Sequence, residues 1–205
     1  MKFPFFASFI VFCLWLGYEI HKSHKTAEKV NRSFWEKEAA ANNTRRKSLD
    51  GLAYITIPFD KLPMAFLDED PVIHEYHQTL YSLAESPIVN LTGISNTDLK
   101  LKYGAPNISL LSRYDQCYTN LARTLQSLGA ALFEAGFPDE AVCYLEFAVS
   151  THTDISASYK LLSSIYKERG EYKKISALIP VAESLNSGFK HSIIAMLKDS
   201  LPSEL

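Results

Sequence analysis

Hydrophobic and polar positions divide the chain into an apolar beginning and a long helical remainder. Residues 3–18 carry no charge and are almost all apolar, and Trp15 and Tyr18 stand near the end of this run. A membrane-spanning helix needs roughly 17–25 residues, and the next two residues can extend the run to that length. No signal-peptidase cleavage pattern of small residues comes after it. The pattern predicts an uncleaved transmembrane helix over residues 1–20.

Basic residues flank this apolar run unequally. Lys2 precedes it, whereas Lys22, Lys25, Lys29 and Arg32 come after it. The positive-inside rule therefore favours a cytoplasmic position for the rest of the chain. Short N-terminal anchors also commonly export the domain behind them, so the side stays open with a slight preference for the cytoplasm. The expected localisation is a cell membrane crossed once.

A polar connecting region separates the apolar run from the domain. Residues 21–53 are expected to form a juxtamembrane stalk and linker, because residues 21–41 lack Gly and Pro and turn-forming residues come after them. Residues 54–67 are rich in β-branched and aromatic side chains but contain Pro58 and Pro63. Proline disfavours both a helix interior and a central strand. This segment is expected to lie extended against the domain.

Apolar spacing predicts helices through most of the domain expected over residues 54–205. Asp70 can cap a helix and Pro71 suits its first turn. A second series of apolar residues predicts one long helix over about residues 107–135. Residues 90–107, in between, are rich in turn formers and predict a long irregular loop. The apolar stripe of the first helix is Ile73, Tyr76, Leu80 and Leu83.

An internal similarity links two stretches in the second half of the chain. A shift of 34 residues places Leu128 on Leu162 and Gly136 on Gly170. With two helices per unit and a glycine at the turn, this period resembles the tetratricopeptide repeat. The small residues Gly129, Ala141 and Ala148 match the positions where helices of that family approach closely.

The resemblance implies an all-α fold of TPR-like helical hairpins behind the N-terminal helix. It covers two repeats, near residues 122–155 and 156–187, and residues 188–201 are expected to form a closing helix. Two residues depart from the family pattern: Ile175 replaces an alanine, and Pro180 should kink or split the second helix of the second repeat. The whole chain also resembles membrane-anchored repeat proteins of Gram-positive bacteria.

The resemblance also implies a working surface. In the family, the first helix of each repeat lines a groove that binds a peptide or a partner helix. Ala130 and Ser164 replace the asparagines of the clamp that binds a terminal carboxylate in some members, so that clamp is absent. The expected function is a membrane-anchored adaptor or scaffold whose groove favours an acidic protein partner. The matching positions are Arg123, Gln126, Phe133, Lys160, Ser164 and Lys167.

Signals for other functions are weak. The 21 basic and 23 acidic residues give a net charge of −2, which does not favour nucleic acid, and three cysteines do not form a disulfide framework. No phosphate-binding glycine loop or nucleophile elbow occurs, so neither an enzyme nor a cofactor is expected. His74 and His77 lie three residues apart on a predicted helix. Zinc needs three or four protein ligands, so a solvated helix face is the preferred interpretation and no metal is expected.

One alternative from a different class stays open. The loop at residues 90–107 can form the wall of a small-molecule or catalytic pocket. Asp98 and Asp115, with Tyr103 between them in the sequence, are the residues that such a site would use for acid–base chemistry.

Overall fold

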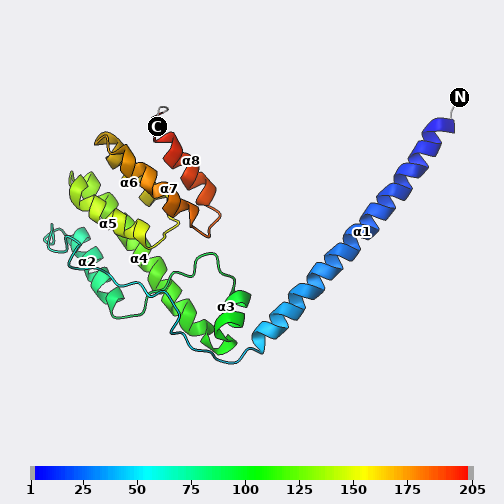
Figure 1. The fold of residues 1–205 in the computed structure, drawn as a ribbon, viewed down its shortest axis with the longest axis horizontal. Helices are drawn as coiled ribbons and strands as arrows, with labels where there is room; N and C mark the ends of the chain where they lie inside the picture. The colour runs from blue at the N-terminus through cyan, green and yellow to red at the C-terminus, as the bar shows by residue number, and fades with distance from the viewer. Residues whose placement is uncertain (1–2, 203–205) are drawn as a thin grey trace. The chain divides into compact units, whose positions relative to one another are not determined.

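The described part of the chain is built from helices. The computed structural model describes residues 3–202, with side chains from Ser8 onward. These residues form eight α-helices and one short 3-10 helix (Figure 1), and their one β interaction is a bridge between Tyr54 and Val89. The all-α prediction is confirmed. In chain order the elements are α1 (Phe3–Asn42), α2 (Pro71–Ala84), α3 (Asn96–Tyr103), η1 (Ala105–Asn107), α4 (Ile108–Glu134), α5 (Pro138–Ser150), α6 (Ser156–Glu168), α7 (Tyr172–Glu183) and α8 (Lys190–Asp199).

The chain divides into two compact units. The first contains α1 and the segment Ser95–Asn107, and the second contains Ser48–Ile94 together with α4 to α8. The prediction that residues 90–107 form an irregular loop is therefore wrong for their second part, which contains α3 and η1. Ser95 caps α3 by accepting a hydrogen bond from the Asp98 N–H at 3.1 Å. This helix of 8 residues has only two buried side chains and so lacks a recognisable apolar stripe.

In the first unit, α1 is one helix of 40 residues that includes both the predicted anchor and the predicted stalk. Near its C-terminal end it packs against α3. Lys37 pairs with Asp98 at 2.7 Å, and Glu38 accepts hydrogen bonds from Lys100 and from Thr97. These bonds, that of Lys100 first, hold the pKa of Glu38 below its usual value. Polar contacts therefore fix α3 on this part of α1.

The apolar part of α1 bears on the predicted membrane anchor. Within the described part of the chain, no helix is both long enough and apolar enough to cross a membrane. The predicted spanning segment begins at the N-terminus, and the side chains of residues 3–7 lie outside the described part. The prediction of a spanning helix is not confirmed.

The second unit consists of helical hairpins stacked beside one another (Figure 1). α4 and α5 form one hairpin and α6 and α7 the next, while α8 packs against α6 and α7 and α2 packs against α4. Gly136 lies in the turn of the first hairpin at φ +88°, and Gly170 lies in the turn of the second at φ +69°. Side chains with a Cβ rarely adopt this left-handed backbone, so both turns favour glycine.

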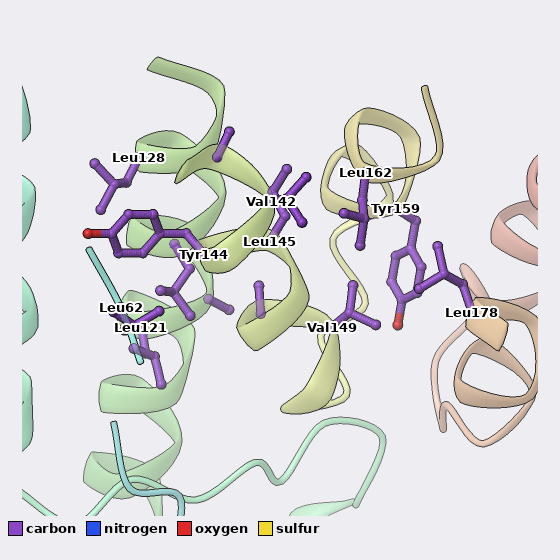
Figure 2. Packing of buried hydrophobic residues seen from close by; sticks show 14 of the residues in the cluster. Leu62, Leu121, Leu128, Val142, Tyr144, Leu145, Val149, Tyr159, Leu162 and Leu178 are labelled. Carbon is purple, nitrogen blue, oxygen red and sulfur yellow. The ribbon is translucent and has the colours of Figure 1, made fainter. Parts of the chain in front are cut away.

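Side chains from every helix of the second unit form its core. Figure 2 shows Tyr144 of α5 pointing toward Leu128 and Leu62, and Tyr159 of α6 lying beside Leu178 of α7. At Gly129 the helices α4 and α5 are very close, because a Cβ there would lie 2.8 Å from Leu145 Cγ. The interpretation of Gly129 as a residue that permits close helix packing is confirmed.

Two local predictions in the second unit have different outcomes. Residues 54–58 lie extended, as expected, but residues 59–67 are mostly turns, so the prediction is wrong for the second part of this segment. Ile57 and Leu62 are buried in the core. Of the two outcomes expected at Pro180, a split is wrong, since α7 continues from Tyr172 to Glu183, while a kink stays a prediction. Pro180 removes the N–H that would bond to the carbonyl of Ser176. Ser176 is exposed, so water can satisfy that carbonyl.

Candidate functional site

The six predicted groove residues lie on the first helix of each hairpin, and α4 contacts α6 directly. Arg123 on α4 and Lys160 and Lys167 on α6 are exposed. The other three, Gln126, Phe133 and Ser164, are half-buried. Phe133 packs against the core cluster, and the hydroxyl of Ser164 donates to the carbonyl of Leu161 at 2.7 Å. The side chains of this surface that are most accessible to a ligand are therefore its three cations.

These cations have no acidic partner in the part of the chain that the structure describes. Among the described residues, Arg123, Lys160 and Lys167 form no ion pair, whereas Arg169 pairs with Asp139 at 2.7 Å and Lys174 with Glu171 at 2.9 Å. An exposed cation without an internal partner keeps its charge available to a ligand, although salt screens it.

The residues of the alternative acid–base site have structural roles, each in its own unit. In the first unit the Asp98 carboxylate accepts hydrogen bonds from Lys37 and from Ser95. The Lys37 bond is the larger cause of a lowered pKa for Asp98. In the second unit Asp115 accepts the backbone N–H of Leu91 at 3.0 Å. Asp98 and Asp115 are therefore both engaged in holding chain segments.

The histidine pair on α2 does not form the solvated face that the sequence suggested. The side chain of His77 is 1% exposed, while that of His74 is half exposed. Asp68 Oδ1 lies 3.0 Å from His74 Nδ1 and 3.1 Å from His77 Nδ1. On its other side, His77 Nε2 lies 2.9 Å from the hydroxyl of the fully buried Tyr144. A chain of polar contacts, exposed at Asp68 and buried at His77 and Tyr144, thus links Asp68, α2 and α5.

Hydrogen-bond chemistry fixes part of the protonation in this chain of contacts. A carboxylate only accepts, so the Nδ1 atoms that face Asp68 carry hydrogens. Neutral His77 then accepts the Tyr144 hydroxyl hydrogen at Nε2. The Tyr144 hydroxyl also lies 3.8 Å from Met64 Sδ.

The surroundings of these contacts shift the pKa values of two of the groups in opposite directions. Hydrogen bonds from His77 and then from His74 hold the pKa of Asp68 below its usual value. Burial raises the pKa of the Tyr144 phenol well above its usual value. Within residues 8–202, no group of three or more His, Cys, Asp and Glu side chains is arranged to hold a metal ion. The chain of contacts therefore has an ionised carboxylate at its exposed end and a neutral phenol at its buried end.

The sequence contained a signal for the burial of His77 that the stripe assignment missed. His77 lies four residues after Ile73 and three before Leu80, which is the spacing of one helix face. The buried residues of α2 are Ile73, His77, Leu80 and Leu83, whereas Tyr76 is only half-buried. The polar partner Tyr144 is 67 residues away in the chain, so sequence spacing could not supply it.

The chain was compared with protein-family models, with curated proteins and with solved structures, and none of the three comparisons gave a match. The class that the structure defines is an all-α protein with a unit of stacked helical hairpins.

Proposed function

We propose that the protein is a membrane-attached, TPR-like adaptor whose stacked hairpins bind an acidic protein partner along α4 and α6. The observation that carries the proposal is the pair of hairpins whose turn glycines, Gly136 and Gly170, lie 34 residues apart at positive φ. Two helices and a turn glycine in this period are typical of repeats whose first helices form a binding surface.

The chemistry of the exposed surface supports an acidic partner. Arg123, Lys160 and Lys167 supply positive charge without internal counter-ions among the described residues. Phe133, half-buried against the core on α4, adds an apolar contact on the same helix as Arg123. Charges at the rim of such a surface act mainly on association rate and partner choice. We infer that the charges select the partner and the apolar contact contributes to its retention.

Attachment to a membrane through the N-terminal end of α1 is part of the same proposal. The described apolar side chains there are exposed, and an exposed apolar run of this size needs a partner or a lipid environment. Aromatic rings favour the boundary between water and hydrocarbon. The exposed residues are Phe9, Ile10, Val11, Phe12, Leu14, Trp15, Leu16, Tyr18 and Ile20.

The proposal is tested by capture with the full-length protein solubilised in mild detergent. The bait is compared with a double variant, Lys160→Glu with Lys167→Glu, and captured proteins are quantified by mass spectrometry. The matched control is Lys61→Glu with Lys173→Glu, which replaces two other exposed lysines by the same two anions. We expect one partner to be lost from the first variant and kept by the control.

Salt gives an independent readout of the same interaction. Raising the ionic strength from about 0.1 M to about 1 M shortens the Debye length from about 10 Å to about 3 Å. Retention of the partner should therefore fall with salt for the unaltered bait. A partner that both double variants retain equally at every salt concentration would contradict binding through this surface.

A further inference from the structure

Three turns of the second unit meet around a cleft that none of the predicted groove residues lines. The cleft has a volume of about 250 Å³, and its polar wall comes from the segment after α2, the α5–α6 turn and the α7–α8 turn. This volume suits a small molecule or a single long side chain, being below the range of about 300–1,000 Å³ for drug-sized ligands. The polar residues that line it are Asn90, Thr92, Thr151, His152, Asp154, Ser184, Asn186 and Ser187.

Long-range hydrogen bonds hold the walls in place. The amide of Asn90 donates to the carbonyls of Thr151 and His152 at 3.0 and 3.1 Å. The amide of Asn186 donates to the carbonyl of Gly93 at 2.9 Å. At Gly93 a Cβ would lie 1.8 Å from the Asn186 carbonyl oxygen, so the two turns touch through their backbones. The cleft is therefore built by tertiary contacts and exists before any ligand binds.

The backbone of His152 is a further sign of this construction. His152 has φ +58°, in the left-handed region that residues with a Cβ seldom occupy. Such a conformation costs on the order of 1 kcal/mol or more and persists where the surroundings fix it. The bonds from Asn90 supply that constraint. They place the imidazole of His152 on the cleft wall.

The side-chain donors of the cleft are largely used inside the protein. The hydroxyl of Ser187 donates to Asp154 Oδ2 at 2.7 Å, and that of Thr151 donates to the Ala148 carbonyl at 2.7 Å. The amide of Asn90 is engaged by two backbone carbonyls. Ser184 has one hydroxyl hydrogen, and the carbonyl of Val181, at 2.6 Å, is its closest acceptor.

This last bond determines the tautomer of His152. Ser184 Oγ also lies 3.1 Å from His152 Nδ1. Because the only hydrogen of Ser184 is directed to Val181, Nδ1 must carry the hydrogen of that contact. Nε2 of neutral His152 is then an acceptor. It has no partner among the described residues.

The groups of the cleft that remain available to a ligand are therefore mainly hydrogen-bond acceptors, and one of them is a negatively charged carboxylate. Asp154 Oδ1, Asn186 Oδ1 and His152 Nε2 form no hydrogen bond within the described part of the chain. Asp154 is the one carboxylate on the wall, and neither lysine nor arginine lines it. The hydroxyl of Thr92 can donate or accept. A ligand complementary to this wall carries positive charge and several N–H donors.

We propose that this cleft is a binding site for a small organic cation with N–H donors, a primary ammonium or a guanidinium. The carboxylate of Asp154 pairs with the cation, and Asn186 and His152 accept its hydrogens. Such a group is carried by free polyamines and by lysine or arginine side chains. This site is separate from the surface proposed for the acidic partner, which lies on α4 and α6 and carries the opposite charge.

The test uses full-length protein in detergent and isothermal titration calorimetry with four probes. Spermidine and agmatine carry N–H cations, a short lysine-containing peptide presents the same group as a side chain, and tetramethylammonium carries the charge without N–H donors. We expect the first two or the peptide to bind and tetramethylammonium to bind at least 10-fold more weakly. If the free amines bind more tightly than the peptide, the natural ligand is a free amine; if the peptide binds more tightly, it is a side chain.

Two matched variants locate the site. Asp154→Asn keeps an acceptor for Ser187 but removes the charge, and we expect it to weaken amine binding at least 10-fold. Asp199→Asn removes one exposed carboxylate from α8 and should leave binding unchanged. Equal weakening by both variants, or equal binding of tetramethylammonium and the amines, would overturn the proposal, as would a lack of binding by every N–H cation. If Asp154→Asn loses its helical circular dichroism signal, the comparison of probes on unaltered protein decides the question.

Discussion

Replacing Gly129 by alanine tests whether α4 and α5 are packed as closely as the structure indicates. The new Cβ would lie 2.8 Å from Leu145 Cγ and 2.9 Å from Leu145 Cδ2, both closer than atoms normally approach. Leu145 is fully buried, so its side chain has no open space to move into. In an isolated helix the same change is favourable, because alanine stabilises a helix interior by about 0.5–1 kcal/mol relative to glycine.

The two effects have opposite signs, so their magnitudes decide the outcome. Forcing an extra methyl group into a packed core typically costs about 1–3 kcal/mol. Subtracting the helix preference from the middle of that range leaves a net destabilisation of about 1 kcal/mol for Gly129→Ala. For a chain of this size that corresponds to a melting temperature lower by about 2–4 °C.

The measurement is urea unfolding followed by circular dichroism, with Leu145→Ala as the matched background. Leu145→Ala removes both atoms that the new methyl group would meet, at a cost of about 2–5 kcal/mol on its own. In that background Gly129→Ala should become neutral or stabilising. A stabilising effect of Gly129→Ala in the unaltered protein, or an equal effect in both backgrounds, would refute the close packing of these helices.

Three further predictions concern the second unit. Gly136→Ala should destabilise the protein by about 1–2 kcal/mol in urea unfolding although space is open around Gly136, because its φ is +88°; unchanged stability would contradict this. His77 and His74 lower the pKa of Asp68, so the stability from its carboxylate is present above the unfolded value of about 4 and is lost as the pH falls through the folded value. Acid unfolding should therefore reduce the stability of the unaltered protein more steeply than that of Asp68→Asn, and parallel pH profiles would count against the link. Burial raises the pKa of Tyr118 to about 12 and raises those of Tyr144, Tyr159 and Tyr166 further, so ultraviolet titration should show several late phenol ionisations. Tyr118→Phe should remove the earliest of these, and loss of a phenol that ionises near the ordinary value of about 10 would contradict its burial.

Helix positions can be predicted from the sequence wherever local chemistry determines them. Asp70 accepts hydrogen bonds from the N–H groups of Val72 and Ile73, and Pro71 begins α2, as the cap rules predict. The turn glycines are recognisable because a helix pair needs a left-handed residue at a fixed place. These features depend on neighbours within a few residues.

The features that the sequence could not supply depend on distant partners. α3 lies in a segment of turn formers. The residues that hold it in place, Lys37 and Glu38 of α1, are about sixty residues away in the chain. The prediction of a surface position for His77 is wrong because its place on the apolar face of α2 was overlooked, and its buried partner Tyr144, 67 residues away, could not be located by spacing. The cleft is missed for the same reason, since three separate turns build it. Tertiary hydrogen bonds between distant residues thus account for the position of α3, for the burial of a polar side chain on α2 and for the cleft.

The most direct test of the proposed adaptor function is site-specific photo-crosslinking in the source cells. A photoreactive residue is placed at Gln126 or Ser164, on the proposed binding surface, and at Ser176, which is exposed on α7, the second helix of its hairpin. The account predicts that both surface positions crosslink to the same acidic protein and that Ser176 does not. Crosslinking of that protein from Ser176 with equal yield, or none from the two surface positions, would contradict binding along α4 and α6.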